Sequence, residues 1–385
     1  MPAVEAAIAL VLAVATPTAA QVTWRARAID EITSTRANTT SPFAPATPDL
    51  WTAANDLLAA GDLLWDASSR VRIGAAALLR ARQPGDVRAR AREAYVRLAP
   101  ASWIDLEAGK RLARWGTGYA FSPTGLLDPP RDPTDPTDRL AAQEGIVALR
   151  ADLFRGPTAF SLAVAAPGID RPPSGPQATG GRLVAARLRT TVAGADVAAV
   201  VSAGDGRTPS WGGNVTYVVG RRFEVHGEAL VHDVRSPWRT LLDGGHGGGR
   251  TMSAVIGGQY TFDRGINIVV ELYRDGNGLT TDGWSRLIAG ARPGAPLPNA
   301  SRPTRQTFLF ARASSADIDA RLVPEVLIIA GLDDGSVTSV AGLSARLSTR
   351  LQAYVRATSL DGPAWSADGS APVAATITAG IAARF

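Results

Sequence analysis

The last ten residues alternate between two kinds of side chain, and this pattern constrains the fold more than any other feature of the sequence. One set comprises Ile377, Ala379, Ile381, Ala383 and Phe385, and the other comprises Thr376, Thr378, Gly380, Ala382 and Arg384. Successive side chains of a β-strand point to opposite faces. The segment is therefore predicted to be a strand with one face suited to lipid, the other suited to water, and an aromatic residue at its end.

This ending resembles the closing strand of bacterial outer-membrane β-barrels, in which the terminal aromatic residue serves as an assembly signal. The resemblance implies that Phe385 is such a signal. It also implies that the lipid bilayer and the outer-membrane assembly machinery are partners of the chain. The alternative at this point is an ordinary terminal strand of a soluble β-protein.

Composition restricts these alternatives. The chain has 385 residues, enough for one large barrel or two soluble domains. Its mean hydropathy is only +0.03, and after residue 20 no apolar run approaches the ~20 residues that a membrane helix needs. A membrane protein with this profile must be a barrel, because only helices and closed barrels satisfy every backbone polar group in lipid. The absence of cysteine is compatible with an envelope protein.

The formal net charge is +5, and Lys110 is the only lysine. A basic chain could bind nucleic acid. Here, however, the arginines are spread along alternating segments and do not cluster in one basic helix or arm. We therefore expect no nucleic-acid partner.

Residues 1–20 contain an apolar stretch followed by small residues, Thr18-Ala19-Ala20, before Gln21. This pattern predicts a signal peptide and a mature chain that begins near Gln21. Glu5 and the lack of a basic residue near the start depart from the usual pattern, and a short buried helix is the alternative.

Residues 21–66 differ from the rest, because the stretch 33–48 is rich in Thr, Ser, Ala and Pro. We interpret 21–66 as a periplasmic N-terminal segment that could enter the barrel mouth as a partial plug. Residues 67–385 are then the transmembrane, all-β, antiparallel up-and-down barrel.

From residue 69 onward, strand-sized segments alternate repeatedly. Arg72 and Arg80, for example, would face inward where Ile73 and Leu79 face outward. The pattern predicts about 16 strands, a number within the range of outer-membrane barrels. Short connections are predicted near residues 99–102, 155–157, 193–194, 220–222, 263–265, 315–317 and 348–350, and long ones at 116–142, 167–181, 235–250, 275–305 and 362–372. This regular change between short and long connections is typical of such barrels, in which the long loops face outward.

A second resemblance lies in residues 106–124. The strand end Gly109-Lys110-Arg111 is followed by Trp115-Gly116-Thr117-Gly118 and then by a proline-containing loop. This resembles a local pattern of porin-like outer-membrane barrels, including alginate-export-like channels, and it implies a passive channel. The loop often reads Asn-Pro-Thr-Asp in those proteins, whereas this chain has Ser122-Pro123-Thr124-Gly125, so no ligand is carried over.

Charged residues on the inward face are the candidate pore lining, because a guanidinium on the lipid face near the midplane would cost ~2–4 kcal/mol. They are Arg72, Arg80, Arg97, Arg111, Arg150, Arg187, Arg189, Arg346, Arg356, Glu93, Glu107, Glu224 and Glu228. In a functional interpretation, arginines that face acids across the lumen create a transverse electric field, which orders dipolar or anionic solutes. A structural interpretation is a network of ion pairs that supports the wall.

The long loop after residue 116 carries Asp128, Asp132, Asp135 and Asp138 among prolines. These carboxylates could form the acidic side of a constriction if the loop folds into the lumen. They could equally cap turns in a rigid surface loop.

Other motifs point to no further chemistry. The glycines of 244–249 lack the Lys-Ser/Thr of a P-loop, and no catalytic motif such as Gly-x-Ser-x-Gly or His-Glu-x-x-His is present. We expect neither a metal nor a cofactor, and no enzymatic activity. The leading hypothesis is an outer-membrane channel for passive diffusion of small polar or anionic solutes. The alternative is a non-conducting barrel with a structural or surface-polymer-binding role.

Overall fold

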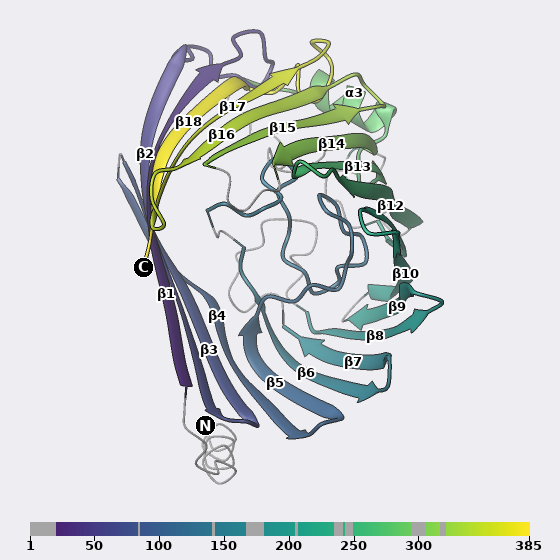
Figure 1. Cartoon of the computed structure of the whole chain (residues 1–385). Helices are drawn as coiled ribbons and strands as arrows, with labels where there is room; N and C mark the ends of the chain where they lie inside the picture. Colours follow the sequence, from purple (N-terminus) through teal and green to yellow (C-terminus); the bar gives the residue numbers. More distant parts are fainter. Residues whose placement is uncertain are drawn as a thin grey trace.

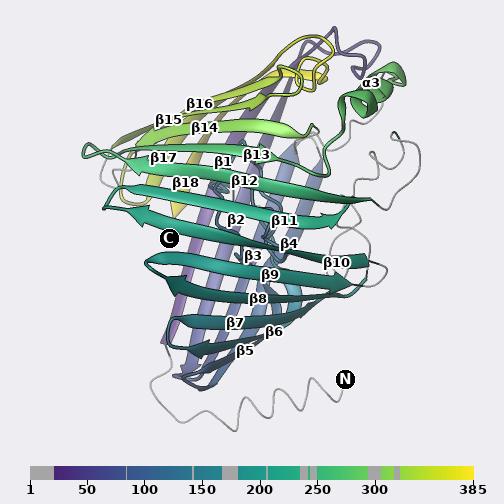
Figure 2. The ribbon, with the colours of Figure 1, turned by 90° about the vertical axis from the view of Figure 1, so that its right-hand side faces the viewer.

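The computed structural model describes residues 21–83, 85–140, 143–166, 181–204, 207–234, 242, 249–293, 305–315 and 321–385. The chain forms a single closed β-barrel (Figures 1 and 2). Residues 1–20, predicted as a signal peptide, and residues 244–248 of the glycine-rich stretch lie outside the described residues.

The barrel wall has 18 strands: β1 (Gln21–Ala37), β2 (Trp51–Ser68), β3 (Val71–Gln83), β4 (Asp86–Ala101), β5 (Ile104–Arg111), β6 (Ile146–Arg155), β7 (Thr158–Ala165), β8 (Leu183–Val192), β9 (Ala195–Gly204), β10 (Arg207–Val219), β11 (Phe223–Asp233), β12 (Arg250–Thr261), β13 (Ile266–Arg274), β14 (Thr307–Ser315), β15 (Leu322–Gly331), β16 (Val337–Arg346), β17 (Leu351–Asp361) and β18 (Val373–Arg384). Each strand pairs antiparallel with the next, and β18 pairs with β1, where Asp30 lies opposite Ile381. The predicted barrel is thus confirmed, although the expected number of about 16 strands is wrong.

The two additional strands are β1 and β2, so the interpretation of residues 21–66 as a segment outside the barrel wall is also wrong. The inner faces of these strands are partly apolar, with Ile29, Leu58 and Ala60 buried against Leu140 of an internal loop. Because these inward positions are apolar, β1 and β2 do not show the alternation of polar inward and apolar outward residues on which the sequence prediction depended.

The inner and outer faces elsewhere follow the predicted alternation. In β18, Ile381 is 50% exposed on the outside, whereas Thr378 is buried and lies close to Thr33 of β1. Exposed aromatic side chains such as Trp103, Trp211 and Phe385 fit a belt at the membrane surface.

The short connections largely agree with the prediction, but the regular change between short and long ones does not hold throughout, because only two residues separate β3 from β4 and β9 from β10 at the other end of the barrel. Two-to-four-residue turns occur near residues 156, 193, 221, 264 and 349, at the barrel end that carries Gln21 and Phe385. The long connections 112–145, 275–306 and 362–372, in their described parts, begin and end at the opposite end. Among the described residues, no helix is long and apolar enough to cross a membrane.

Four connections at this end of the barrel pack together into what we call the cap, which comprises the described residues of 38–50, 275–306, 332–336 and 362–372. The cap contains the helix α3 (Thr281–Ala289), which begins after the N-cap residue Thr280. Phe43, Leu279, Trp284 and Leu287 form its apolar centre. Arg305 is fully buried beside Asp334, with 3.4 Å between its Nε and a carboxylate oxygen.

Candidate functional site: a loop inside the barrel

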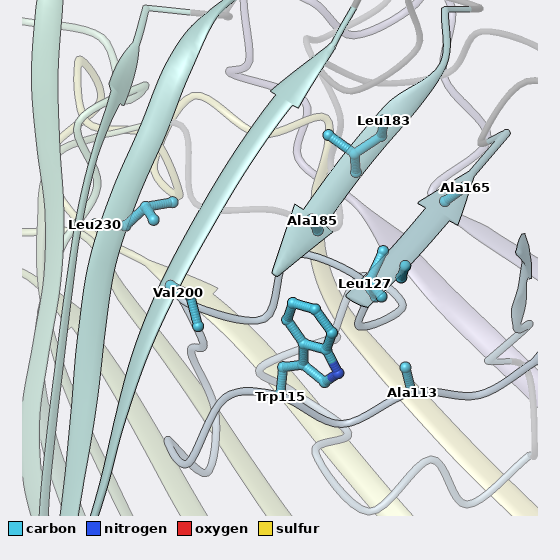
Figure 3. Packing of buried hydrophobic residues seen from close by; sticks show 9 residues of the cluster. Ala113, Trp115, Leu127, Ala165, Leu183, Ala185, Val200 and Leu230 are labelled. Carbon is cyan, nitrogen blue, oxygen red and sulfur yellow. The ribbon is translucent and has the colours of Figure 1, made fainter. Parts of the chain in front are cut away.

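The connection between β5 and β6 lies inside the barrel, and we call its described residues, 112–140 and 143–145, the lumen loop (Figure 1). Ala113, Trp115 and Leu127 pack against apolar side chains of β7, β8, β9 and β11 (Figure 3). Ala120 and Phe121 pack against β12 to β16. The loop therefore contacts much of the inner wall and does not stand in outer solvent.

Trp115 belongs to this internal packing and is only 3% exposed. From the sequence alone, Trp115 would suit the aromatic belt at the membrane surface equally well. The structure instead places it between the loop and the inner faces of β7 and β8, where it holds the start of the loop against the wall.

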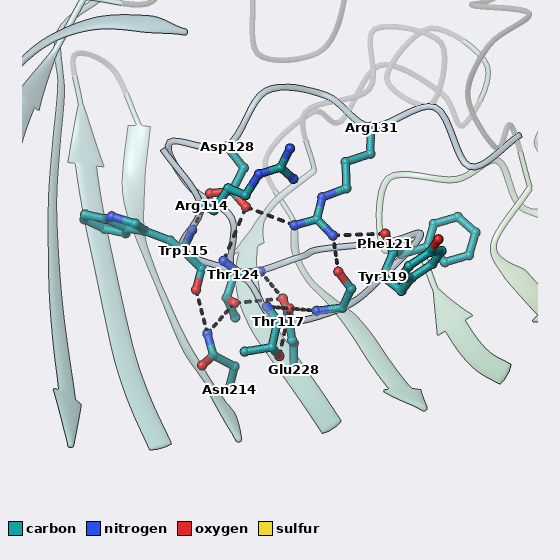
Figure 4. Close-up of polar contacts among 12 residues, drawn as sticks. Arg114, Trp115, Thr117, Tyr119, Phe121, Thr124, Asp128, Arg131, Asn214 and Glu228 are labelled. Carbon is teal, nitrogen blue, oxygen red and sulfur yellow. Dashed lines mark hydrogen bonds and ion pairs between the residues drawn. The ribbon is translucent and has the colours of Figure 1, made fainter. Parts of the chain in front are cut away.

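The backbone of the lumen loop is bound by carboxylates, because it has no regular secondary structure to satisfy its N–H groups. Trp115 and Gly116 donate backbone hydrogen bonds to Asp128, at 2.6 and 3.3 Å (Figure 4). Asp128 is 6% exposed and also lies 3.4 Å from a guanidinium nitrogen of Arg131. It therefore closes the loop on itself and does not face open lumen.

The next donors bind Glu228 on the inner face of β11. Thr117 and Gly118 donate backbone N–H groups to its Oε1, the second at 2.6 Å. Thr124 donates its backbone N–H to Oε2 at 2.9 Å and its hydroxyl at 2.7 Å. Glu228 was predicted to line the pore, and it does face inward, but it lies buried beneath the loop.

The following three donors bind Glu271 on β13, which is fully buried. The N–H groups of Tyr119, Ala120 and Phe121 all point to its carboxylate, the last two at 2.9 and 3.4 Å. His226 of β11 places its Nε2 2.8 Å from the same carboxylate. Every backbone N–H from residue 115 to residue 121 thus binds one of three carboxylates.

Two glycines explain why the Trp-Gly-x-Gly motif has its spacing. A Cβ on Gly116 would overlap the hydroxyl of Ser122 and come within 2.9 Å of Glu228. A Cβ on Gly118 would overlap the carbonyl oxygen of Phe121. Glycine at both positions therefore lets the bend pack this closely on itself and, at Gly116, on Glu228.

The second part of the loop is held by side chains. Arg139 binds Glu31 of β1 at 2.6 Å and lies 4.5 Å from the ring centre of Tyr354 on β17. Arg356, also on β17, donates to the carbonyl oxygen of Thr134 and lies 3.9 Å from Asp135.

The remaining predicted loop aspartates cap turns. Asp132 accepts from the backbone N–H of Thr134 at 2.9 Å, Asp135 accepts from that of Arg139 at 3.1 Å, and Asp138 accepts from that of Gln143 at 3.2 Å. The predicted surface loop is therefore wrong, because the loop packs against the inner wall, although its aspartates do cap turns. The acidic side of a constriction stays a prediction. Only Asp132 is exposed among the four.

The predicted arginines lie on the inner faces of their strands, and most are paired with carboxylates. Arg72 binds Asp66 at 2.6 Å, Arg80 binds Asp56 at 2.8 Å, Arg97 binds Asp105, Arg111 binds Glu107, Arg150 binds Asp152 at 2.9 Å, and Arg189 binds Asp196 at 3.0 Å. Arg346 is opposite Gln352 in the register. The Nε of Arg187 is buried and has no hydrogen-bond partner among the described residues.

The other predicted acids are distributed between the wall and the loop. Glu93 accepts the backbone N–H of Leu112 at 2.8 Å, at the start of the loop. Glu224 is half-buried and lies 3.6 Å from His226. Glu107 is 3.6 Å from Arg150 and also contacts Arg111.

Several residues of this site were not predicted from the sequence. The sequence did not single out Arg114, an exposed loop cation that donates to the side chain of Gln143 at 3.0 Å, or Arg139 and its partner Glu31. A charge in an unassigned loop carries no periodic signal, and Glu31 lay in a segment that was not recognised as a strand. Among the described residues, no group of three His, Cys, Asp or Glu is arranged to hold a metal ion.

Comparisons with known proteins reveal similarity of fold. No family model matches the chain, and no curated protein matches it. OccAB1 of Acinetobacter baumannii has a similar structure, with a TM-score of 0.62, 7% identity, and 94% of this chain and 96% of that chain covered.

Two structures from Pseudomonas aeruginosa are also similar. OpdK gives a TM-score of 0.61 at 10% identity, with 95% of this chain and 98% of that chain covered. OccK2 (OpdF), solved in complex with glucuronate, gives the same values. A closed barrel with this extent of structural overlap identifies the fold of this chain as that of outer-membrane porins.

Proposed function

We propose that the chain is a passive diffusion channel of the bacterial outer membrane for small polar, preferentially anionic solutes. The observation that carries this proposal is the lumen loop, which is bound to the inner wall of a closed barrel by its backbone. Such a loop narrows the lumen and gives it a fixed lining, as a selective pore requires. The barrel functions in this proposal as a channel and not as an enzyme.

The preference for anions follows from how the inward charges are used. Asp128, Glu228 and Glu271 are buried and bind backbone N–H groups, so their charge is compensated by the loop. The guanidinium of Arg187 is half-buried, and its Nε has no partner among the described residues. Arg114 is exposed beside a neutral amide. These two cations are therefore better placed than the buried acids to attract a passing solute.

The class of solute is a small carboxylate. A guanidinium binds a carboxylate through two parallel hydrogen bonds, which favours this group over a halide ion. Glucuronate, the ligand of the OccK2 structure, is a carboxylate of this size class.

The proposal also includes the processing and the orientation of the chain. Residues 1–20 are removed on export, and the barrel inserts with residues 69–70 and the other short turns on the periplasmic side.

The test is conductance of the purified protein in planar bilayers under a salt gradient. We expect discrete channels whose reversal potential indicates a preference for anions. The double variant Arg114→Gln and Arg187→Gln should shift this potential toward cations, because charges that line a pore set its ion preference.

The matched control is Arg264→Gln, which removes one exposed cation from the turn between β12 and β13. Salt screens such an exposed charge within ~8–10 Å, so the reversal potential of the Arg264→Gln channel should stay at the wild-type value. A correctly folded wild-type protein without conductance would contradict the channel proposal and leave the structural or polymer-binding role. An unchanged potential in the double variant would limit Arg114 and Arg187 to a structural role.

A further inference from the structure

The carboxylates of Glu228 and Glu271 hold the part of the lumen loop that reaches farthest across the barrel. They belong to β11 and β13, whereas the loop leaves the wall at β5. Together they bind the N–H groups of residues 117–121 and 124. We propose that these two glutamates are positioning residues that fix the loop and thereby set the width of the conducting path. This inference rests on the proposed channel function.

Glu228 needs both of its oxygens for this role. Its Oε1 accepts from two consecutive residues, Thr117 and Gly118, and its Oε2 accepts from Thr124 on the other side of the bend. The carboxylate therefore ties together two points of the loop that are six residues apart. A glutamine has the same shape, but its amide nitrogen would face one of these donors.

Glu271 is placed by its neighbours in the sheet. His226, Gly257 and Glu271 lie opposite one another on β11, β12 and β13. A Cβ on Gly257 would lie 2.7 Å from the Cγ of Glu271 and 2.8 Å from the Nε2 of His226. The missing side chain at this position lets the imidazole contact the carboxylate across the intervening strand. The carboxylate then presents both oxygens to Tyr119, Ala120 and Phe121.

The alternative is that apolar packing alone holds the loop. Phe121 stacks on Tyr273 with 4.2 Å between ring centroids, and Ala120 is buried in the same cluster. Packing is insensitive to the exchange of Glu for Gln, because volume and shape are retained. The Glu→Gln exchange therefore separates the two explanations.

Accessibility of a single cysteine provides a direct readout. The chain contains no cysteine, so Ser122→Cys introduces a unique thiol within the held bend. The hydroxyl oxygen of Ser122 is buried without a hydrogen-bond partner among the described residues. We expect slow reaction of this thiol with a water-soluble maleimide in the otherwise wild-type protein. In the Glu228→Gln and Glu271→Gln backgrounds the rate should rise at least tenfold.

Conductance supplies the functional readout in the same variants. A loop that has lost its anchors should sample several positions, so the open-channel current should become noisy and its mean should change. The matched control is Asp66→Asn, which also removes an inward carboxylate but one that binds Arg72 on the wall. This control should alter neither the labelling rate nor the current noise.

Heat-modifiable migration on gels establishes that each variant has formed its barrel. If Glu271→Gln does not assemble, Gly257→Ala displaces the same carboxylate from the wall side and should increase labelling in the same way. Equal labelling rates in wild-type, Glu228→Gln and Glu271→Gln backgrounds would overturn the inference. If folded wild-type protein does not conduct, the channel proposal fails, while labelling still decides whether the glutamates position the loop.

Discussion

The lumen loop and the cap are both irregular, yet they are held in different ways. In the cap, Asp334 accepts backbone N–H groups from Ser336 at 3.0 Å and from Ala367 at 2.8 Å, so donors and acceptor all belong to the connections themselves. In the lumen loop, Glu228 and Glu271 belong to the wall. The position of the loop therefore depends on the barrel strands, whereas the cap depends mainly on its own contacts.

This difference separates the expected consequences of mutation. A buried backbone donor that loses its partner costs ~1–3 kcal/mol. Such a loss in the lumen loop should change what passes through the barrel. The same loss in the cap should loosen one end of the molecule and leave the lumen as it is.

The largest effect should come from Phe385→Asp, because it attacks the wall on which the lumen loop depends. The backbone N–H of Phe385 donates to the carbonyl oxygen of Ala26 at 2.8 Å, and the side chain is 63% exposed on the outside. A charge at this end of the seam should reduce insertion severalfold, because an open sheet edge cannot be hidden in lipid. The amount of heat-modifiable protein in the outer membrane measures this, with Phe385→Trp as the aromatic control. Normal amounts of Phe385→Asp would refute the assembly signal.

A large effect on the loop alone is expected from Gly118→Val. Its Cβ would overlap the carbonyl oxygen of Phe121, so residues 117–121 cannot keep their hydrogen bonds to the wall. The barrel should still form, but single-channel conductance should change at least twofold. Gly156→Val is the control, because an added Cβ there meets nothing within 4 Å, although its φ of +57° also disfavours valine. Equal conductance of both variants would show that the loop tolerates displacement.

The corresponding change in the cap is Arg305→Met. Arg305 donates to the carbonyl oxygen of Thr280 at 2.9 Å and is paired with Asp334, so its removal leaves a buried charge. Breaking a buried pair in this way costs ~3–5 kcal/mol. We expect faster proteolysis within the cap and unchanged conductance. Arg286→Met, on the exposed side of α3, should have less effect on proteolysis. A changed conductance in Arg305→Met would mean that the cap and the loop are coupled.

The smallest effect should be the pH dependence of the cap. Burial, with smaller contributions from Asp334 and Asp361, raises the pKa of Asp368 from 3.8 to about 6. The folded cap therefore binds this proton more tightly than the unfolded chain, so the stabilisation is complete below pH ~4 and is lost as pH rises through about 6. Proteolysis of the cap should be slower at pH 5 than at pH 7.5, after correction for protease activity. Asp368→Asn should abolish this difference, and its persistence would contradict the assignment.

The sequence was sufficient for the barrel because alternation and connection length are local properties. Residues 376–385, for example, carry the alternation, and the two-residue connection at 193–194 carries the length signal, without reference to the rest of the chain. It was insufficient for β2, where Leu58 and Ala60 face inward toward a loop that lies 80 residues later. The same local alternation separates Arg72 and Arg80 from Ile73 and Leu79 along β3, but the pore-lining role of these arginines stays a prediction.

The anchoring of the lumen loop could not be predicted in this way. Glu228 was recognised as inward, but its contact with Thr117 and Thr124 depends on the tilt and stagger of strands on the far side of the barrel. Only the Gly-x-Gly spacing of 116–118 gave a local signal that the backbone approaches another group closely.

The contacts of Arg139 and Arg356 have a consequence for the order of folding. Glu31, the partner of Arg139, lies on β1, and Arg356 lies on β17, so the lumen loop spans the seam where β18 meets β1. The seam joins residues 336 to 357 positions apart, from Ala37 and Val373 to Arg27 and Arg384, and contacts of such sequence separation form slowly. We therefore expect the contacts of the lumen loop with Glu31 and Arg356 to form late in folding, when the seam closes. A barrel whose seam is still open lacks these contacts, so the loop should stabilise the closed wall relative to the open one.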